Sequence, residues 1–77
     1  CYKGYFIALE LKTGNYQPDP LQIIYLKKVR DANGFGLILR DTMHELMILL
    51  SCIDNGMERQ YTPPKLPDVN VEEIEFD

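Results

Sequence analysis

The stretch from Tyr5 to Leu39, YFIALELKTGNYQPDPLQIIYLKKVRDANGFGLIL, decides the fold of this chain. Residues 5–12 are apolar, aromatic and β-branched until the run ends in charged residues, which predicts a central strand covered on both faces. Residues 35–39 form a second short apolar run. A segment of helix length separates the two runs, and this spacing favours a parallel pair of strands joined by a right-handed crossover.

The segment between the two expected strands carries helix signals at both ends. Asp19 is a good N-cap, Pro20 falls at the first helical position, and Gln22 falls at the capping-box position. Asn33-Gly34 is a strong stop signal. We therefore expect a helix over residues 21–31. Its expected buried stripe consists of Leu21, Ile24, Tyr25, Leu26, Val29 and Ala32.

A second helix is expected from Met43 to Ile53. Thr42 and Glu45 have the spacing of a capping box at its start, and Asn55-Gly56 ends it. Its expected buried side consists of Leu46, Met47, Leu49, Leu50 and Ile53.

The compact part of the chain is expected to span residues 1–56. Lys3-Gly4 predicts a tight turn, so Cys1–Tyr2 is interpreted as the end of a preceding strand. The predicted fold class is therefore α/β, with a small mixed sheet and two helices in the order ββαβα. Residues 57–77 are a proline-rich segment followed by an acidic tail. Apolar and acidic residues alternate over 69–76, which is typical of an edge strand or of a tail ordered by a partner.

Length and composition limit the classes of function. The chain has 77 residues, of which 45% are hydrophobic and 26% charged, so it forms one small domain of ordinary globular composition. No apolar run approaches the ~20 residues of a membrane span, and there is no signal-peptide pattern. Two cysteines are too few for a disulfide scaffold, although one disulfide between them stays open. We expect an intracellular, cytoplasmic protein with no membrane partner.

The net charge of −4 is unevenly distributed. Its acidity comes from the C-terminal end, where Lys65 is accompanied by five acidic residues, while residues 1–59 are balanced. The overall charge therefore argues only weakly against binding to nucleic acid.

Glu10 and Lys12 end the first expected strand, and the period of two places their side chains on one face. A functional reason for this arrangement is a site for Mg²⁺ or Mn²⁺, in which the Glu10 carboxylate and the Leu11 carbonyl supply oxygen ligands. Lys12 would then orient a metal-bound water and offset charge on an attacked phosphate. The alternative is an ion pair between residues i and i+2 at the end of a strand.

The order of these motifs resembles a known family. Phe6-Ile-Ala-Leu-Glu-Leu-Lys12, a polar loop, Pro20-Leu-Gln22 at the start of a helix and Asn33-Gly34-Phe-Gly-Leu-Ile-Leu39 together resemble the PD-(D/E)XK nuclease superfamily. Within it they are most similar to the small VRR-NUC and Holliday-junction-resolvase-like enzymes of phages and bacteria. The resemblance implies a restriction-endonuclease-like core and metal-dependent hydrolysis of DNA phosphodiester bonds, at junctions or flaps.

Carried over residue by residue, the resemblance implies that Glu10 is the acidic metal ligand, Lys12 the lysine of the motif, and Gln22 a side chain that points toward the site. From the residues alone, Gln22 is equally well a helix cap. The family also needs an Asp on the preceding strand, and none of the nine residues before Glu10 is acidic. We therefore expect either a core truncated at its N-terminus, with that Asp upstream of Cys1, or a non-catalytic nuclease-like module that binds a protein partner.

DNA contacts are expected to be mostly to phosphates. The candidate residues are basic: Lys12, Lys27, Lys28, Arg30 and Arg40. For Lys27 and Lys28 a solvated helix face is the alternative interpretation. Related resolvases act as dimers, so the resemblance also implies a homodimer, joined through an exposed sheet edge or through residues 69–76.

Overall fold

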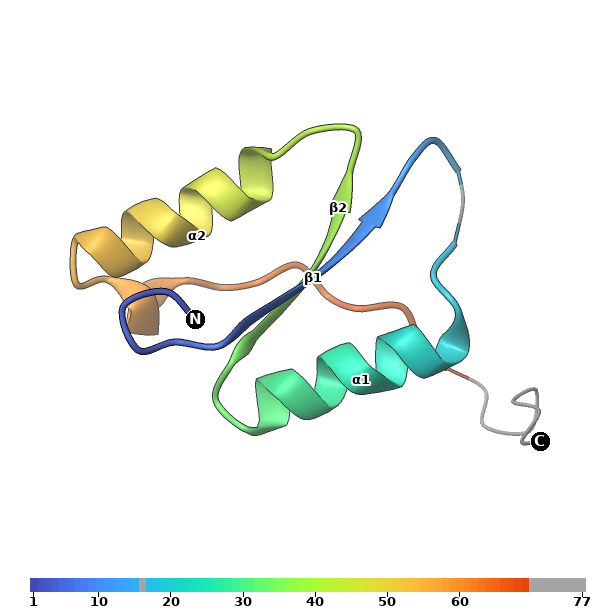
Figure 1. Cartoon of the computed structure of the whole chain (residues 1–77), viewed down its shortest axis with the longest axis horizontal. Coiled ribbons are helices and arrows are strands. Elements are labelled where there is room, and N and C mark those ends of the chain that lie inside the picture. Colours follow the sequence, from blue (N-terminus) through green and yellow to red (C-terminus); the bar gives the residue numbers. More distant parts are fainter. Residues whose placement is uncertain (16, 70–77) are drawn as a thin grey trace.

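The computed structural model describes residues 1–15 and 17–69. The elements follow the order β1 (Ile7–Lys12), α1 (Pro20–Asp31), β2 (Phe35–Arg40), α2 (His44–Asp54) and a short 3₁₀-helix, η1 (Glu58–Gln60) (Figure 1). The chain is therefore a small α/β protein with two strands and two helices in its described part. The strand predicted within residues 69–76 lies, apart from Val69, outside the described residues.

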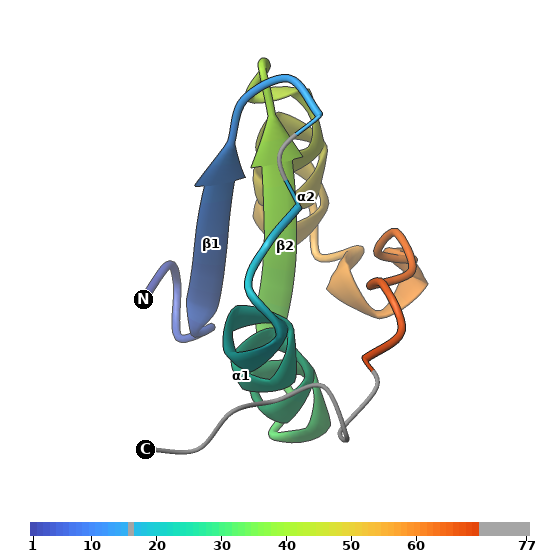
Figure 2. The same cartoon turned by 90° about the vertical axis from the view of Figure 1, so that its right-hand side faces the viewer.

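The two strands are parallel, as the spacing predicted. Their register runs from Ile7 opposite Phe35 to Lys12 opposite Arg40, and both arrows point the same way in Figure 2. Successive side chains of a strand point to opposite faces of the sheet. Figure 1 shows α1 on one face and α2 on the other, so the sheet is the middle of three layers.

Helix α1 begins and ends as its sequence predicts. The Asp19 carboxylate accepts a hydrogen bond from the Leu21 N–H, and Gln22 Oε1 accepts one from the Asp19 N–H, each at 2.9 Å. At the other end Asn33 adopts a left-handed conformation, with φ at 67°. The N–H groups of Asn33 and Gly34 donate to the carbonyls of Arg30 and Val29, which is the Schellman arrangement.

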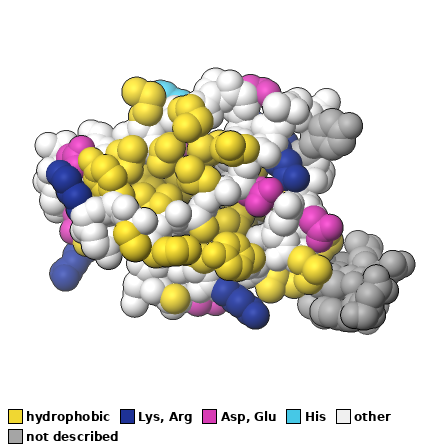
Figure 3. Space-filling model, viewed as in Figure 1, with side chains coloured by type: hydrophobic (Ala, Val, Ile, Leu, Met, Phe, Trp, Pro, Cys, Tyr) yellow, Lys and Arg dark blue, Asp and Glu magenta, His cyan; other side chains and the backbone are white. Residues whose placement is uncertain are grey.

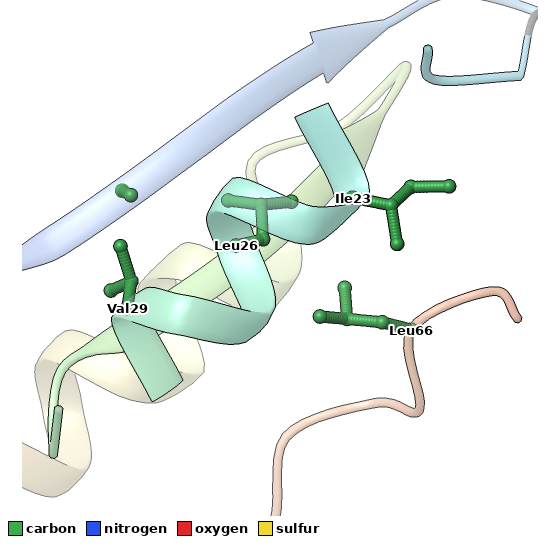
Figure 4. Close-up of a cluster of buried hydrophobic side chains, with 5 residues drawn as sticks. Ile23, Leu26, Val29 and Leu66 are labelled. Atoms are coloured by element: carbon green, nitrogen blue, oxygen red, sulfur yellow. The ribbon is translucent and has the colours of Figure 1, made fainter. Parts of the chain in front are cut away.

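The layer between α1 and the sheet buries a narrower helix face than the sequence suggested. Ile23, Leu26 and Val29 pack against Ala8 of β1 and against Leu66 from the segment after η1 (Figure 4). The predicted stripe was partly wrong, because Leu21 and Tyr25 are about half exposed, Ala32 is exposed, and Ile23 was missed. Helix α1 approaches the sheet closely at Gly36, where an added Cβ would lie 2.7 Å from the Leu26 carbonyl oxygen.

The layer between α2 and the sheet contains Leu37 and Leu39 of β2 with Leu49 and Ile53 of α2. Helix α2 therefore packs on β2, and it leaves Met47 67% exposed, contrary to expectation.

The predicted capping box of α2 is also wrong. The helix begins one residue later, with Met43 as the N-cap and no side-chain capping bond. Thr42 Oγ1 accepts only a long bond, 3.4 Å, from the His44 N–H. The Glu45 carboxylate accepts a 2.6 Å hydrogen bond from the Tyr61 hydroxyl instead of reaching back to the helix start.

Within the described residues, β1 is an edge strand and not the central strand that its composition predicted. The described sheet has two strands, and Leu9 and Leu11 on the α2 side are 38% and 64% exposed because α2 lies over β2. The turn at Lys3-Gly4 is present, with both residues at positive φ. Before it, the expected strand is reduced to a single antiparallel bridge between Tyr2 and Tyr5.

The proline-rich segment after η1 runs beside β2, on the side away from β1 (Figure 2). Its Leu66 is 6% exposed and completes the α1 layer of the core. Residues beyond position 56 thus contribute to the packing of the compact part.

Candidate functional site

Glu10 and Lys12 lie together at the end of β1, on its α1 face. Lys12 Nζ is 3.8 Å from Glu10 Oε1, and the two side chains are 23% and 26% exposed. The register places Ile38 beside Glu10 and Arg40 beside Lys12. The sequence-based prediction that these two side chains share a face is confirmed. Both the ion pair and a reactive carboxylate–ammonium pair are compatible with this geometry.

The backbone next to Glu10 offers a further oxygen. The Phe6 carbonyl accepts a hydrogen bond from the Phe35 N–H, so Phe6 directs its backbone groups toward β2. Backbone groups of successive strand residues alternate in direction. The Leu11 carbonyl therefore points to the outer edge of β1, where the described sheet has no pairing strand.

The donors present are suited to a hard cation. Glu10 and the Leu11 carbonyl are oxygen ligands, which Mg²⁺ and Mn²⁺ prefer, and Mg²⁺ commonly takes its other ligands from one further carboxylate, substrate phosphate and water. Within residues 1–15 and 17–69 there is no group of three or more His, Cys, Asp or Glu side chains that could hold a metal. A metal at Glu10 would therefore depend on ligands from other sources.

Gln22 serves as a helix cap. Its Oε1 is occupied by the Asp19 N–H at 2.9 Å, which is the second of the two roles that the sequence left open. A contribution of Gln22 to the Glu10 site stays a prediction.

The basic residues of α1 lie in different surroundings. Arg30 turns to the sheet, where its Nε and Nη2 donate to the Gly36 carbonyl at 2.9 and 2.6 Å. Burial lowers the pKa of Arg30. Lys27 lines a hollow with Arg30 and Lys65, whereas Lys28 lies beside Phe6 at a separate hollow. Of the three expected nucleic-acid contacts on α1, Lys27 and Arg30 therefore share a hollow, and Lys28 lines a different one.

Lys65, in the proline-rich segment after η1, is a further cationic residue on this side of the molecule. Lys65 lines a cavity with Arg30 and Arg40. Arg40 also donates to the Gly14 carbonyl at 3.3 Å and to Gln17 Oε1 at 3.4 Å. Sequence reasoning missed Lys65, because nothing in a proline-rich segment signals where it docks.

The opposite face carries exposed apolar side chains, which include Leu9 and Leu11 of β1 and Met43 and Met47 at α2. Leu11 and Met43 line one hollow. The four residues are 38%, 64%, 50% and 67% exposed. Figure 3 shows hydrophobic side chains gathered over α2 and the part of the molecule beside it. A contiguous exposed apolar surface is a common mark of an interaction site.

A cluster of hydrogen bonds ties the N-terminal turn to the end of α2. The Tyr2 hydroxyl donates to Asp54 Oδ1 at 2.7 Å, and Lys3 Nζ lies 2.7 Å from the same oxygen. The Lys3 ammonium and then the Tyr2 hydroxyl lower the pKa of Asp54. The Asp54 carboxylate in turn raises the pKa values of Lys3 and Tyr2.

We expect this N-terminal attachment to weaken in both acid and alkali. The pKa of Asp54 is lowered in the folded chain, so its contribution is present above the ordinary value of 3.8 and is lost as the pH falls through the folded value. The pKa values of Tyr2 and Lys3 are raised, so their contribution is present below about pH 10 and is lost as the pH rises. NMR signals of residues 1–5 should report both transitions. Asp54→Asn should remove the acid transition, and signals that stay constant from pH 7 to strong acid in the parent chain would contradict the assignment.

Comparison with known proteins gives no relative: no family model, no curated protein and no solved structure matches this chain. None of the described helices combines the length and the apolar character needed to cross a membrane.

Proposed function

We propose that this chain is a metal-dependent endonuclease domain of the PD-(D/E)XK type, which hydrolyses phosphodiester bonds of DNA at junctions or flaps. The observation that carries the proposal is the Glu10–Lys12 pair. A carboxylate and an ammonium share one face at the exit of a strand, 3.8 Å apart, and each keeps about a quarter of its surface exposed. That arrangement is what the resemblance to the nuclease motif requires of these two residues.

Each residue has a defined part in the proposed reaction. Glu10 and the Leu11 carbonyl would hold Mg²⁺ or Mn²⁺, which when bound would supply a water of lowered pKa and positive charge for the phosphate. Lys12 places its ammonium beside Glu10, where it can position the attacking water and stabilise the negative charge that develops on the phosphate. Arg40, the register partner of Lys12, adds a second cation at the same end of the sheet.

The proposal also includes the finer fold, a restriction-endonuclease-like core in the order ββαβα. The outer edge of β1 is unpaired within the described residues, so a strand that carries a second carboxylate has a place beside Glu10. Such a strand would supply the Asp that the family requires. An enzyme of this kind would act in the cytoplasm of a cell or of a phage-infected host.

The test is a cleavage assay on branched, flap and linear DNA, using the longest natural form of the chain. We expect cleavage with Mg²⁺ or Mn²⁺ and none after the metal is removed with EDTA, since one carboxylate and one ammonium alone cannot activate water sufficiently at neutral pH. Restoring the metal should restore the activity. Cleavage that persists in EDTA, or no cleavage by a folded chain under any of these conditions, would contradict the proposal.

A second candidate is a non-catalytic module that binds another copy of this chain. It is favoured by the exposed apolar side chains of Leu9, Leu11, Met43 and Met47, and by the edge of β1, which has no pairing strand within the described residues. Two β1 edges could pair and cover these side chains. A mass of two chains by light scattering, together with absence of cleavage, would favour this second function; a homodimer that cleaves DNA would fit the first.

A further inference from the structure

The outer edge of β2 and the segment after η1 enclose a cavity of about 200 Å³. Three cationic side chains from three parts of the chain line it: Arg30 of α1, Arg40 of β2 and Lys65. Its remaining lining is apolar and consists of Leu37, Ile38, Pro64, Leu66 and Pro67. No Asp or Glu occurs among the described residues that line it, so the charge of its lining is positive, while Asp31 and Asp68 line an adjoining hollow with Arg30 and Lys65.

Arg30 is the residue that most needs a negative partner. Both of its hydrogen bonds end on the Gly36 carbonyl, which is neutral. The ion pairs Lys3–Asp54 and Lys12–Glu10 do not include Arg30. Asp31 and Asp68 line a neighbouring hollow with Arg30, and within the described residues neither forms an ion pair with its guanidinium. A partly buried cation without a counter-charge is unfavourable, and an anion in the cavity would relieve this cost.

The chemistry of the lining selects the kind of anion. A guanidinium group binds phosphate oxygens through a planar fork of N–H donors, and a lysine adds a mobile point charge. The three positive charges of the lining exceed the single negative charge of a carboxylate. They match better a phosphate group, which has several oxygen acceptors. The apolar part of the lining, which includes Pro64 and Pro67, offers contact to the sugar attached to a phosphate.

We propose that this cavity binds a phosphate group of a nucleic-acid strand, held between Arg30, Arg40 and Lys65. Arg40 is the register partner of Lys12, so the cavity adjoins the Glu10–Lys12 site. A strand that is cut at Glu10 would then present a neighbouring phosphate here. The nucleic-acid source rests on the proposed function, whereas binding of the phosphate itself does not require cleavage.

The experiment is carried out in EDTA, so that binding is separated from cleavage. The full chain is titrated with inorganic phosphate at constant ionic strength, and the side-chain N–H signal of Arg30 is followed by NMR. A fluorescent oligothymidine is titrated in parallel by anisotropy over a range of salt concentrations. Lys65→Gln is compared with Arg59→Gln, a matched loss of one positive charge in η1, outside the cavity lining.

We expect a saturable shift of the Arg30 signal with phosphate and tighter binding of the oligonucleotide. Lys65→Gln should weaken both and reduce the slope of log K against log salt by about 0.7, the value for one contact to a single strand, while Arg59→Gln should change neither. Binding of phosphate without oligonucleotide would support the phosphate site and overturn its nucleic-acid source. No Arg30 shift with either probe, or equal weakening by the two variants, would overturn the site.

Discussion

Glu10→Gln is expected to reduce metal-dependent cleavage of DNA by at least ~10²-fold in kcat/KM, because the amide removes the negative charge that holds the cation. The substitution keeps the size of the side chain and its place at the end of β1. Lys12→Ala should cause a loss of ~10²–10³-fold, the usual effect of removing one group that stabilises charge in the transition state. The measurement is single-turnover cleavage of the same DNA by folded variants.

The same variants separate the catalytic interpretation from a structural one. A partly exposed ion pair contributes only about 0–1 kcal/mol to stability, so the thermal midpoint should barely change in either variant. Asp31→Asn at the exposed end of α1 is the matched control for the loss of a negative charge, and it should cleave like the parent chain. Parent-like cleavage by Glu10→Gln would leave the Glu10–Lys12 pair as a strand-end ion pair and refute its role in the reaction.

Leu26→Ala is expected to unfold most of the population. Leu26 is 1% exposed and lies at the centre of the layer between α1 and the sheet. Truncation of a fully buried leucine costs about 2–5 kcal/mol. A core of this size seldom supplies more than ~3–5 kcal/mol in total, so the loss is comparable with the whole stability of the domain. Far-UV circular dichroism during urea denaturation measures it.

Leu21→Ala is the control on the same helix. Leu21 is 50% exposed, so the same chemical change should alter stability by no more than about 0.5 kcal/mol. A similar loss of stability in the two variants would show that the buried face of α1 is not the one formed by Ile23, Leu26 and Val29.

Local signals in the sequence predicted the elements well. The Asp19, Pro20 and Gln22 signals gave the start of α1, and Asn33-Gly34 gave its end, because capping depends on hydrogen bonds between near neighbours. The two apolar runs and the helix between them gave the parallel pair of strands. These features require no knowledge of distant parts of the chain.

Features that depend on distant contacts were predicted poorly. The run Leu21–Val29 is apolar on more than one side, so periodicity alone could not choose between Tyr25 and Ile23 for the core. Glu45 was assigned to a capping box, yet its carboxylate accepts a hydrogen bond from the hydroxyl of Tyr61, sixteen residues later in the chain. The exposure of Leu11 follows from the placement of α2 over β2, which no residue of β1 encodes.

The candidate site shows the same division. Alternation along a strand was enough to place Glu10 and Lys12 on one face. The position of Lys65 at the cavity that Arg30 also lines depends on how the proline-rich segment returns to β2. That return has no periodicity or turn signal in the sequence.

The two edges of the sheet differ in a way that limits self-association. The Gly36 carbonyl on the outer edge of β2 is occupied by Arg30, and the segment beside that edge is rich in prolines, which have no N–H to offer a neighbouring strand. Within residues 1–15 and 17–69, the edge of β1 has no neighbouring strand. Two copies that joined through their β1 edges would leave the proline-flanked edges of β2 outermost, and such edges disfavour the addition of further strands and growth into fibrils.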